Sequence, residues 1–234
     1  MAALGARKAE TPAEAAGKSD ILITMLSNDS VLLEVFHGEN GIMKGVREGQ
    51  IIIDSSTVSP AASQKLHQEL AASGAAFLDA PVTGSKPAAE RGTLIFMVGG
   101  DAEALEDSRE VLSAMGSKII HMGPSGSGSY AKLAHNTMVG INMAGLAEGL
   151  AIATRAGLDP EAFLQVVLNG SGNSRQAELK GSKIVNRDFS TVLPWPHAEG
   201  SAAGLRSERS VPAAHAYAED GLFAVPDGLQ QRAR

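Results

Sequence analysis

The fold is decided by residues 118–157, which read KIIHMGPSGSGSYAKLAHNTMVGINMAGLAEGLAIATRAG. The segment begins with a short apolar strand, continues through a loop of Gly, Ser and Pro, and then shows one long helical pattern filled with small residues. A helix from Ser129 to Ala156 would extend about 40 Å, which is wider than a small domain. We therefore predict that this helix joins a sheet-containing half of the chain to an all-helical half.

Upstream of that segment, apolar runs of strand length alternate with helical patterns. Several runs are apolar on both faces, as in the central strands of a parallel sheet. The predicted strands are Ile21–Leu26, Ile51–Asp54, Ala76–Val82, Leu94–Gly100 and Lys118–Gly123, and residues 83–93 are predicted to form a loop. This alternation is typical of an α/β fold with a mostly parallel sheet.

Downstream of Gly157 the strands disappear. Asp159-Pro160-Glu161 has the cap and the proline of a helix start, and a second helix is predicted over residues 176–185. Residues 194–234 are rich in Ala, Gly, Pro and Ser without a sustained period, which predicts a disordered tail. The expected organisation is a sheet domain over residues 1–123, an all-α domain over 124–193 and an irregular tail over 194–234.

Composition narrows the class of protein. Asp and Glu number 26 against 20 Lys and Arg, for a net charge of −6 without a long basic block, so we expect no nucleic-acid partner. Cysteine is absent, which excludes thiolate chemistry and fits a reducing compartment; we expect a cytoplasmic location, with an organellar matrix as the alternative. No signal-peptide core and no uncharged apolar run of about 18 residues is present, so no membrane span is expected. HExxH and EF-hand spacings are also absent, and no metal site is expected.

The loop before the long helix, from Gly126 to Ala131, fits the G-x-G-x-x-G/A dinucleotide fingerprint. No βαβ unit follows it, and the acid expected about 20 residues later would be Glu148, within the helix. A pyrophosphate site is therefore the weaker interpretation. The stronger one is that the exposed N–H groups of the helix start favour a carboxylate or a developing oxyanion.

Lys132 and Asn136 lie four residues apart and hence on one face of the first helical turns. A lysine in a partly dry site can have its pKa lowered and exchange a proton with a substrate oxygen, while Asn holds that oxygen or orients the lysine. The alternative is a solvated Lys at a polar helix start. We interpret His135 as a surface or capping residue.

Three glycines interrupt the same helix at positions 140, 145 and 149. Each costs about 1 kcal/mol relative to Ala, which is tolerable where another helix must approach closely. We therefore predict close helix packing, including packing between subunits, and expect a homo-oligomer formed through the helical domain. Chance placement of the glycines is the alternative.

Three segments lie at the ends of predicted strands. The segments are Met25-Leu26-Ser27, Ser55-Ser56-Thr57 and Thr83-Gly84-Ser85. Open α/β sheets bind ligands at the carboxyl ends of their strands, so all three segments could line one crevice. The alternative for Thr83-Gly84-Ser85 is a plain strand-to-loop turn.

Three motifs in this order resemble the β-hydroxyacid dehydrogenase family, which includes 3-hydroxyisobutyrate dehydrogenases and tartronate-semialdehyde or glyoxylate reductases. They are DSSTVSP (Asp54–Pro60), DAPVTGSKPAAERGTLIFMVGG (Asp79–Gly100) and GPSGSGSYAKLAHN (Gly123–Asn136). The resemblance implies a Rossmann-like domain, a long interdomain helix and an all-α domain that often dimerises. It implies NAD- or NADP-dependent hydride transfer between a short 3-hydroxy acid and its semialdehyde.

The resemblance also implies site residues. Lys132 matches the family's general acid/base and Asn136 the residue beside it. Thr83 and Gly84 match the pair that grips the substrate carboxylate, with Ser85 next to them. Met25, Leu26 and Thr57 match positions near the nicotinamide. The chain departs from the family at Thr83 (usually Ser), Ser85 (usually Gly), Ser27 (commonly Pro) and His135 (usually Asn).

Two larger departures from the family pattern bear on whether the chain can bind a cofactor and catalyse the reaction. The family begins with a strand, G-x-G-x-M-G and a second strand, whereas this sequence matches from after both, so we expect the pyrophosphate loop to be absent, the sheet edge to be uncovered and the NAD or NADP preference to be unreadable. The tail replaces an expected helix, and we hypothesise a frameshift near Pro194 that the nucleotide sequence would test. The alternative function is therefore an inactive, truncated remnant that folds and associates without binding cofactor.

Overall fold

A computed structural model describes residues 5–188 and residue 190. They form two compact units, one ending at His135 and the other beginning at Asn136. The helix α6 (Ser127–Arg155) runs through this boundary, two residues earlier at its start than predicted. The predicted tail, residues 194–234, and its postulated frameshift site lie outside the described residues.

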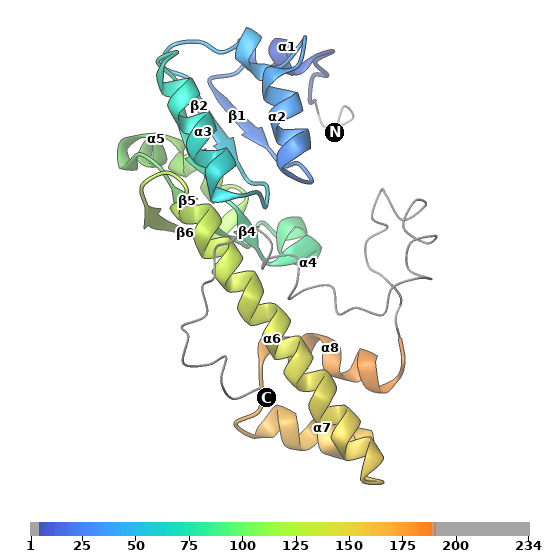
Figure 1. The fold of residues 1–234 in the computed structure, drawn as a ribbon. Helices are drawn as coiled ribbons and strands as arrows, with labels where there is room; N and C mark the ends of the chain where they lie inside the picture. The colour runs from blue at the N-terminus through green and yellow to red at the C-terminus, as the bar shows by residue number, and fades with distance from the viewer. Residues whose placement is uncertain (1–4, 189, 191–234) are drawn as a thin grey trace, which may run out of the picture. The chain divides into compact units, whose positions relative to one another are not determined.

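The first unit is built on one sheet of six strands (Figure 1). The strands are β1 (Ile21–Thr24), β2 (Ile51–Asp54), β3 (Ala76–Asp79), β4 (Val82–Thr83), β5 (Leu94–Gly99) and β6 (Gly116–Gly123). The pairs β1–β2, β2–β3 and β5–β6 are parallel, and β5 pairs antiparallel with β3 and β4. The expected mostly parallel sheet is thus confirmed, and β1 forms one edge of it.

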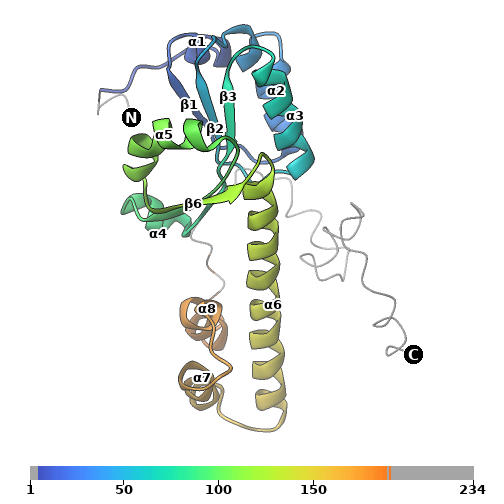
Figure 2. The same ribbon diagram turned by 90° about the vertical axis from the view of Figure 1, so that its left-hand side faces the viewer.

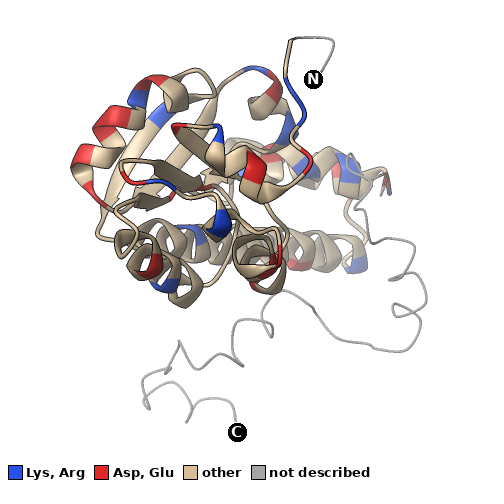
Figure 3. Ribbon diagram, turned by 90° about the horizontal axis from the view of Figure 1, so that it is seen from above, with Lys and Arg blue, Asp and Glu red and all other residues tan. Residues whose placement is uncertain are grey.

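Short helices connect these strands, and their starts follow from local sequence. They are α1 (Pro12–Gly17), α2 (Asp29–His37), the 3-10 turn η2 (Ile42–Lys44), α3 (Pro60–Ala71), α4 (Ser85–Glu90) and α5 (Ala102–Ser113). Thr11, Asn28 and Ser59 each accept a backbone N–H from the first helical turn, as N-cap side chains do. Acidic and basic residues are interspersed along the helices (Figure 3), as the absence of a basic block predicts.

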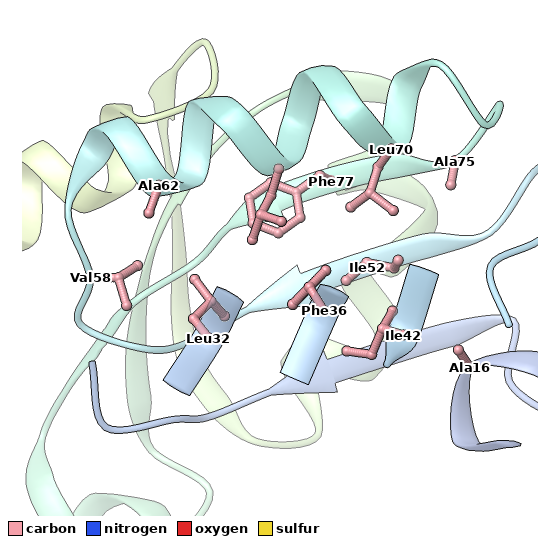
Figure 4. Packing of buried hydrophobic residues seen from close by; sticks show 11 residues of the cluster. Ala16, Leu32, Phe36, Ile42, Ile52, Val58, Ala62, Leu70, Ala75 and Phe77 are labelled. Carbon is pink, nitrogen blue, oxygen red and sulfur yellow. The ribbon is translucent and has the colours of Figure 1, made fainter. Parts of the chain in front are cut away.

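The sheet is buried on both faces because successive strand residues point to opposite sides. On one face, Ile52 and Phe77 pack with Leu32 and Phe36 of α2 and with α3, and the labelled side chains in Figure 4 point toward one another. On the other face, Ile53 of β2 and Leu78 of β3 pack with α5. Figure 2 shows α2 and α3 on one side of the strands and α5 on the other.

The segment predicted as a loop, residues 83–93, contains regular secondary structure instead. The strand predicted to reach Val82 ends at Asp79, and Val82 and Thr83 turn to pair antiparallel with Phe96 and Ile95. The helix α4 follows directly. A strand of two residues and a helix of six are too short to show hydrophobic periodicity, which is why the sequence pattern does not reveal them.

The second unit contains only helices among its described residues. After α6 come α7 (Pro160–Asn169) and α8 (Arg175–Val185), as predicted. Leu146 and Leu150 of α6 pack with Leu164 of α7 and Ala177 of α8 in a small core. Gly149 lies in this contact, because a Cβ there would sit 3.6 Å from the Phe163 ring, whereas Gly140 and Gly145 face no atom within 4 Å.

By length and composition α6 is apolar enough to cross a membrane, because only Glu148 carries a charge between residues 133 and 154. One such helix is weak support for a membrane span, since core helices of soluble proteins pass the same test.

A buried polar network ends β2. Asp54 is fully buried, and its Oδ1 accepts from Thr24 Oγ1 at 2.7 Å, Ser56 Oγ at 2.6 Å and Ser56 N–H at 3.3 Å. Its Oδ2 has no partner among the described residues. Burial raises the pKa of Asp54 because desolvation disfavours the carboxylate, and this outweighs the hydrogen bonds, which favour it.

We predict that Asp54→Asn stabilises the protein increasingly as pH rises. A raised folded-state pKa gives stability that is complete below the ordinary aspartate range and is lost as pH rises through the folded-state pKa. The neutral amide of Asn does not ionise, so the variant keeps this stability. The gain in the free energy of unfolding is about 1.4 kcal/mol for each pH unit by which the folded-state pKa of Asp54 exceeds its unfolded-state pKa. Urea unfolding at several pH values measures the difference. The exposed change Asp107→Asn is the matched control, and a difference independent of pH would contradict the account.

Candidate active site

Three parallel strands end side by side, so their carboxyl ends lie at the same end of the sheet. Thr24 pairs with Asp54 and Asp54 with Asp79 in the parallel register of β1, β2 and β3. The segments that follow these residues therefore leave the sheet at this carboxyl end. Met25 follows the end of β1 and Thr57 lies three residues after the end of β2, whereas Thr83 lies in β4, paired with Ile95 of β5.

The ends of β1 and β2 are joined by one hydrogen bond. The backbone N–H of Leu26 donates to Ser56 Oγ at 2.8 Å, and Ser56 in turn donates to Asp54. Met25 is 66% exposed and Thr57 is also exposed, so both are open to a ligand. The hydroxyl of Ser55, the first residue after β2, is buried with no partner in the described structure. An orphaned buried hydroxyl costs free energy unless a ligand or water satisfies it.

The Thr83-Gly84-Ser85 segment bends sharply at the junction of β4 and α4. Gly84 has φ 128° and Ser85 has φ 56°, which is the left-handed region that non-glycine residues seldom occupy. Thr83 is half-buried, while Gly84 and Ser85 are exposed. The strained serine occupies the position where the family pattern has glycine, so the bend itself is retained.

The head of α6 contacts the sheet through Asp79. Asp79 Oδ1 accepts the N–H of Gly126 at 2.7 Å, and Oδ2 accepts the N–H of Ser129 at 2.8 Å. The sequence predicts a carboxylate at this Gly-rich helix start, and the structure shows that the carboxylate belongs to the chain itself. The expectation that these N–H groups serve a substrate, and the weaker alternative of a pyrophosphate, are both wrong because Asp79 already occupies them.

Asp79 is fully buried, and no ion pair of the described residues includes it. Desolvation raises its pKa, opposed by the N–H groups of Gly126 and Ser129, which favour the carboxylate. The positive end of the helix dipole and these two hydrogen bonds thus take the place of water around the acid.

Lys132 lies one turn further along α6. Its Nζ donates to the carbonyl oxygen of Val82 at 2.8 Å, which places the amine beside Thr83. Lys132 is partly buried, and this desolvation lowers the pKa of its ammonium group. The lysine therefore lies in a partly dry environment, and its hydrogen bond to Val82 fixes the position of the amine.

His135 differs from its predicted role as a surface or capping residue. It is half-buried in mid-helix, and its Nε2 lies 3.5 Å from Thr83 Oγ1. Asn136, four residues after Lys132 on α6, is the first residue of the second unit and is half-buried. The structure thus brings Lys132, His135 and Thr83 together, and separately joins Leu26 to Ser56.

Two features of this region escape sequence reasoning. Asp79 lies inside the predicted strand Ala76–Val82, and its only signal is a lone acid among apolar residues. Ser63 of α3 and Ser129 share a buried hydrogen bond of 3.0 Å, which joins residues 66 positions apart and has no local signature. No cluster of three His, Asp or Glu side chains that could hold a metal was found among the described residues.

Comparison with known proteins identifies the family. Residues 1–123 match the profile described as the NAD binding domain of 6-phosphogluconate dehydrogenase. Residues 126–192 match the profile described as NAD-binding of NADP-dependent 3-hydroxyisobutyrate dehydrogenase. Together the two matches cover nearly all of the described residues.

Individual proteins agree with these profiles. The chain is 42% identical over 168 residues to mitochondrial 3-hydroxyisobutyrate dehydrogenase of Mus musculus, covering 72% of this chain and 50% of the relative. It is 37% identical to 2-(hydroxymethyl)glutarate dehydrogenase of Eubacterium barkeri, covering 81% of this chain and 63% of the relative. The chain thus spans about half the length of the 3-hydroxyisobutyrate dehydrogenases it matches.

A solved structure shows the same fold. It is 3-hydroxyisobutyrate dehydrogenase of Mycobacterium tuberculosis with L-serine, at a TM-score of 0.70 and 31% identity, covering 79% of this chain and 65% of that chain. Profiles, sequence relatives and fold agree with the three motifs, and the chain belongs to the β-hydroxyacid dehydrogenase family.

Proposed function

We propose that this chain contributes the catalytic lysine and part of the cofactor site of a nicotinamide-dependent dehydrogenase. The reaction is hydride transfer between a short 3-hydroxy acid and its semialdehyde, or the related reduction of a glyoxylate-type substrate. The observation that carries the proposal is the Lys132 amine, partly buried and 2.8 Å from the Val82 carbonyl oxygen, at the edge where the strands end.

Lys132 performs the proton transfer. Because burial lowers the pKa of its ammonium group, less free energy is needed to reach the neutral amine than in an exposed lysine. The neutral amine accepts the hydroxyl proton during oxidation, and the ammonium returns it to the carbonyl oxygen during reduction. Asn136, one turn further along α6, holds the same substrate oxygen in this proposal.

The substrate carboxylate is placed at Thr83, Gly84 and Ser85. The hydroxyl of Thr83 and the backbone of this sharply bent segment offer hydrogen-bond donors. His135 Nε2 lies 3.5 Å from Thr83 Oγ1 and gives this side of the site a second polar group. Lys132, bonded to the neighbouring Val82, adds the positive charge that an anionic substrate favours.

The residues at the ends of β1 and β2 fit a nicotinamide cofactor, either NAD or NADP. Met25 and Thr57 are exposed, and the unpartnered Ser55 hydroxyl next to the end of β2 offers a hydrogen-bonding group to the ligand. Leu26 is held beside them through Ser56. When bound, the cofactor supplies or accepts the hydride. The chain's own residues orient the substrate and move the proton.

The alternative is a remnant that folds and associates without cofactor. It is favoured by one observation: among the described residues β1 is an edge strand, and none of β1, β2 and β3 is followed by a G-x-G-x-x-G loop that could cradle a pyrophosphate. Turnover distinguishes the two candidates.

We predict that Lys132→Met lowers turnover about 10²- to 10⁴-fold, because it removes the proton-transferring amine and keeps the length of the side chain. The measurement is NADH or NADPH oxidation with a series of short semialdehydes and glyoxylate. Lys118→Met, at an exposed lysine of β6, is the control and should retain wild-type rates.

Two outcomes would contradict the proposal. If Lys132→Met keeps wild-type turnover, the lysine is not the acid/base. If the folded wild-type chain turns over none of these substrates with either cofactor, the remnant alternative holds.

The helical unit is proposed to pair with a second copy of the chain. Met138, Ile141 and Ile152 of α6 are 65–67% exposed, and with Gly145 they follow spacings of three, four and seven residues, so they form one stripe along the helix. Gly145, on this stripe, leaves room for a helix to approach closely. A surface of this kind is commonly covered by protein.

We predict that Ile141→Gln shifts the protein toward monomer in sedimentation velocity, because it places a polar amide in the middle of the stripe. Val111→Gln, at a partly exposed residue of α5, is the matched control and should leave the sedimentation coefficient unchanged. A wild-type chain that is monomeric at all concentrations, or equal shifts in the two variants, would refute the proposed interface.

A further inference from the structure

We propose that Asp79 is a positioning residue that sets the place of Lys132 by fixing the head of α6. The inference rests on the proposed function of Lys132 as the proton-transferring group. It extends that function to a buried acid that touches neither substrate nor cofactor in the proposed site. All the contacts involved lie within the first unit.

The first step is the bond between acid and helix. Each carboxylate oxygen of Asp79 accepts one backbone N–H, from Gly126 and from Ser129, so the carboxylate spans the first turn of α6. Two bonds of 2.7 and 2.8 Å from one rigid group determine both the axial position and the rotation of that turn. Charge-assisted bonds of this length are the strong class of hydrogen bond.

The second step is the close packing around these two hydrogen bonds. A Cβ on Gly128 would lie 2.3 Å from the carbonyl oxygens of both Asp79 and Met97, and a Cβ on Gly99 would lie 2.6 Å from Asp79 Oδ1. The helix head therefore rests directly on the ends of β3 and β5. The 3.0 Å contact between Ser129 and Ser63 joins the same turn to α3.

The third step leads from the helix head to the amine. Lys132 is three residues after Ser129, hence on the same face of α6 one turn later. Its Nζ bonds to the carbonyl of Val82, which is three residues after Asp79. Residues 79–82 thus hold α6 at two points, the carboxylate and the carbonyl. If the first is lost, the helix can slide or turn, and the amine leaves its partly buried position.

The test is Asp79→Asn, which keeps the size of the side chain but turns an amide NH₂ toward one of the two N–H donors. The variant should lower turnover about 10- to 100-fold, the usual consequence of a small misplacement. It should also raise the pKa of the Lys132 amine toward that of exposed lysines. This pKa is read from the NMR titration of reductively methylated lysines, with Lys132→Met assigning the resonance.

The direction of that shift separates positioning from simple electrostatics. Removing a negative charge without moving the helix could only lower the pKa of Lys132, because an anion favours the ammonium form. A rise therefore reports that the amine has moved toward water. Leu112→Ala, a cavity in the core beneath α5, is the stability control and should leave the Lys132 titration unchanged even where it lowers the melting temperature as much.

Each outcome decides the inference. A folded Asp79→Asn variant with wild-type turnover and an unchanged Lys132 titration overturns it, as does an equal effect of Leu112→Ala. If the wild-type chain shows no turnover but Asp79→Asn raises the Lys132 pKa, the positioning role stands and the proposed function fails.

If Asp79→Asn does not fold, the wild-type chain supplies the test. The amide protons of Gly126 and Ser129 should titrate with Asp79, and the Lys132 resonance should change at the same midpoint. A Lys132 resonance that is unaffected there overturns the inference.

Discussion

The contact on which the first unit depends is the Asp79 carboxylate against the head of α6. A buried carboxylate without a cationic partner is costly, and here two backbone N–H groups and the helix dipole replace its solvent. The contact joins the sheet to the helix that carries Lys132. It also accounts for Gly99 and Gly128, because any side chain there would separate the two elements.

Buried acids recur along the same edge of the sheet. Asp54 and Asp79 are neighbours in the register of β2 and β3, and burial raises the pKa of both. Such groups are poor sources of stability, since apolar residues could fill the space at lower cost. Their value is geometric, because Asp54 holds Leu26 through Ser56 while Asp79 holds α6. A family of enzymes that must align a cofactor with a substrate gains from that rigidity.

The sequence predicts much of this architecture, because the central strands are continuous apolar runs and the helix starts carry recognisable caps. Asp159 caps α7 as predicted. What it misses is either too short for periodicity, as with β4 and α4, or depends on tertiary contact, as with Asp79 and His135. The Gly-rich loop is instructive, since its sequence indicates an anion at the helix start and cannot say that the anion is a residue 47 positions upstream. The substrate is likewise unreadable, because the bent segment at Thr83 would hold many short carboxylates.

The central claim is that the carboxyl ends of β1, β2 and β3 hold a nicotinamide cofactor beside Lys132. Calorimetric titration of the intact chain with NADH and NADPH tests it most directly, with Ser55→Ala as the variant that removes the orphaned hydroxyl. The account predicts saturable micromolar binding of one cofactor per chain, weakened in the variant. Absence of binding to the folded chain at millimolar concentrations of both cofactors would contradict it.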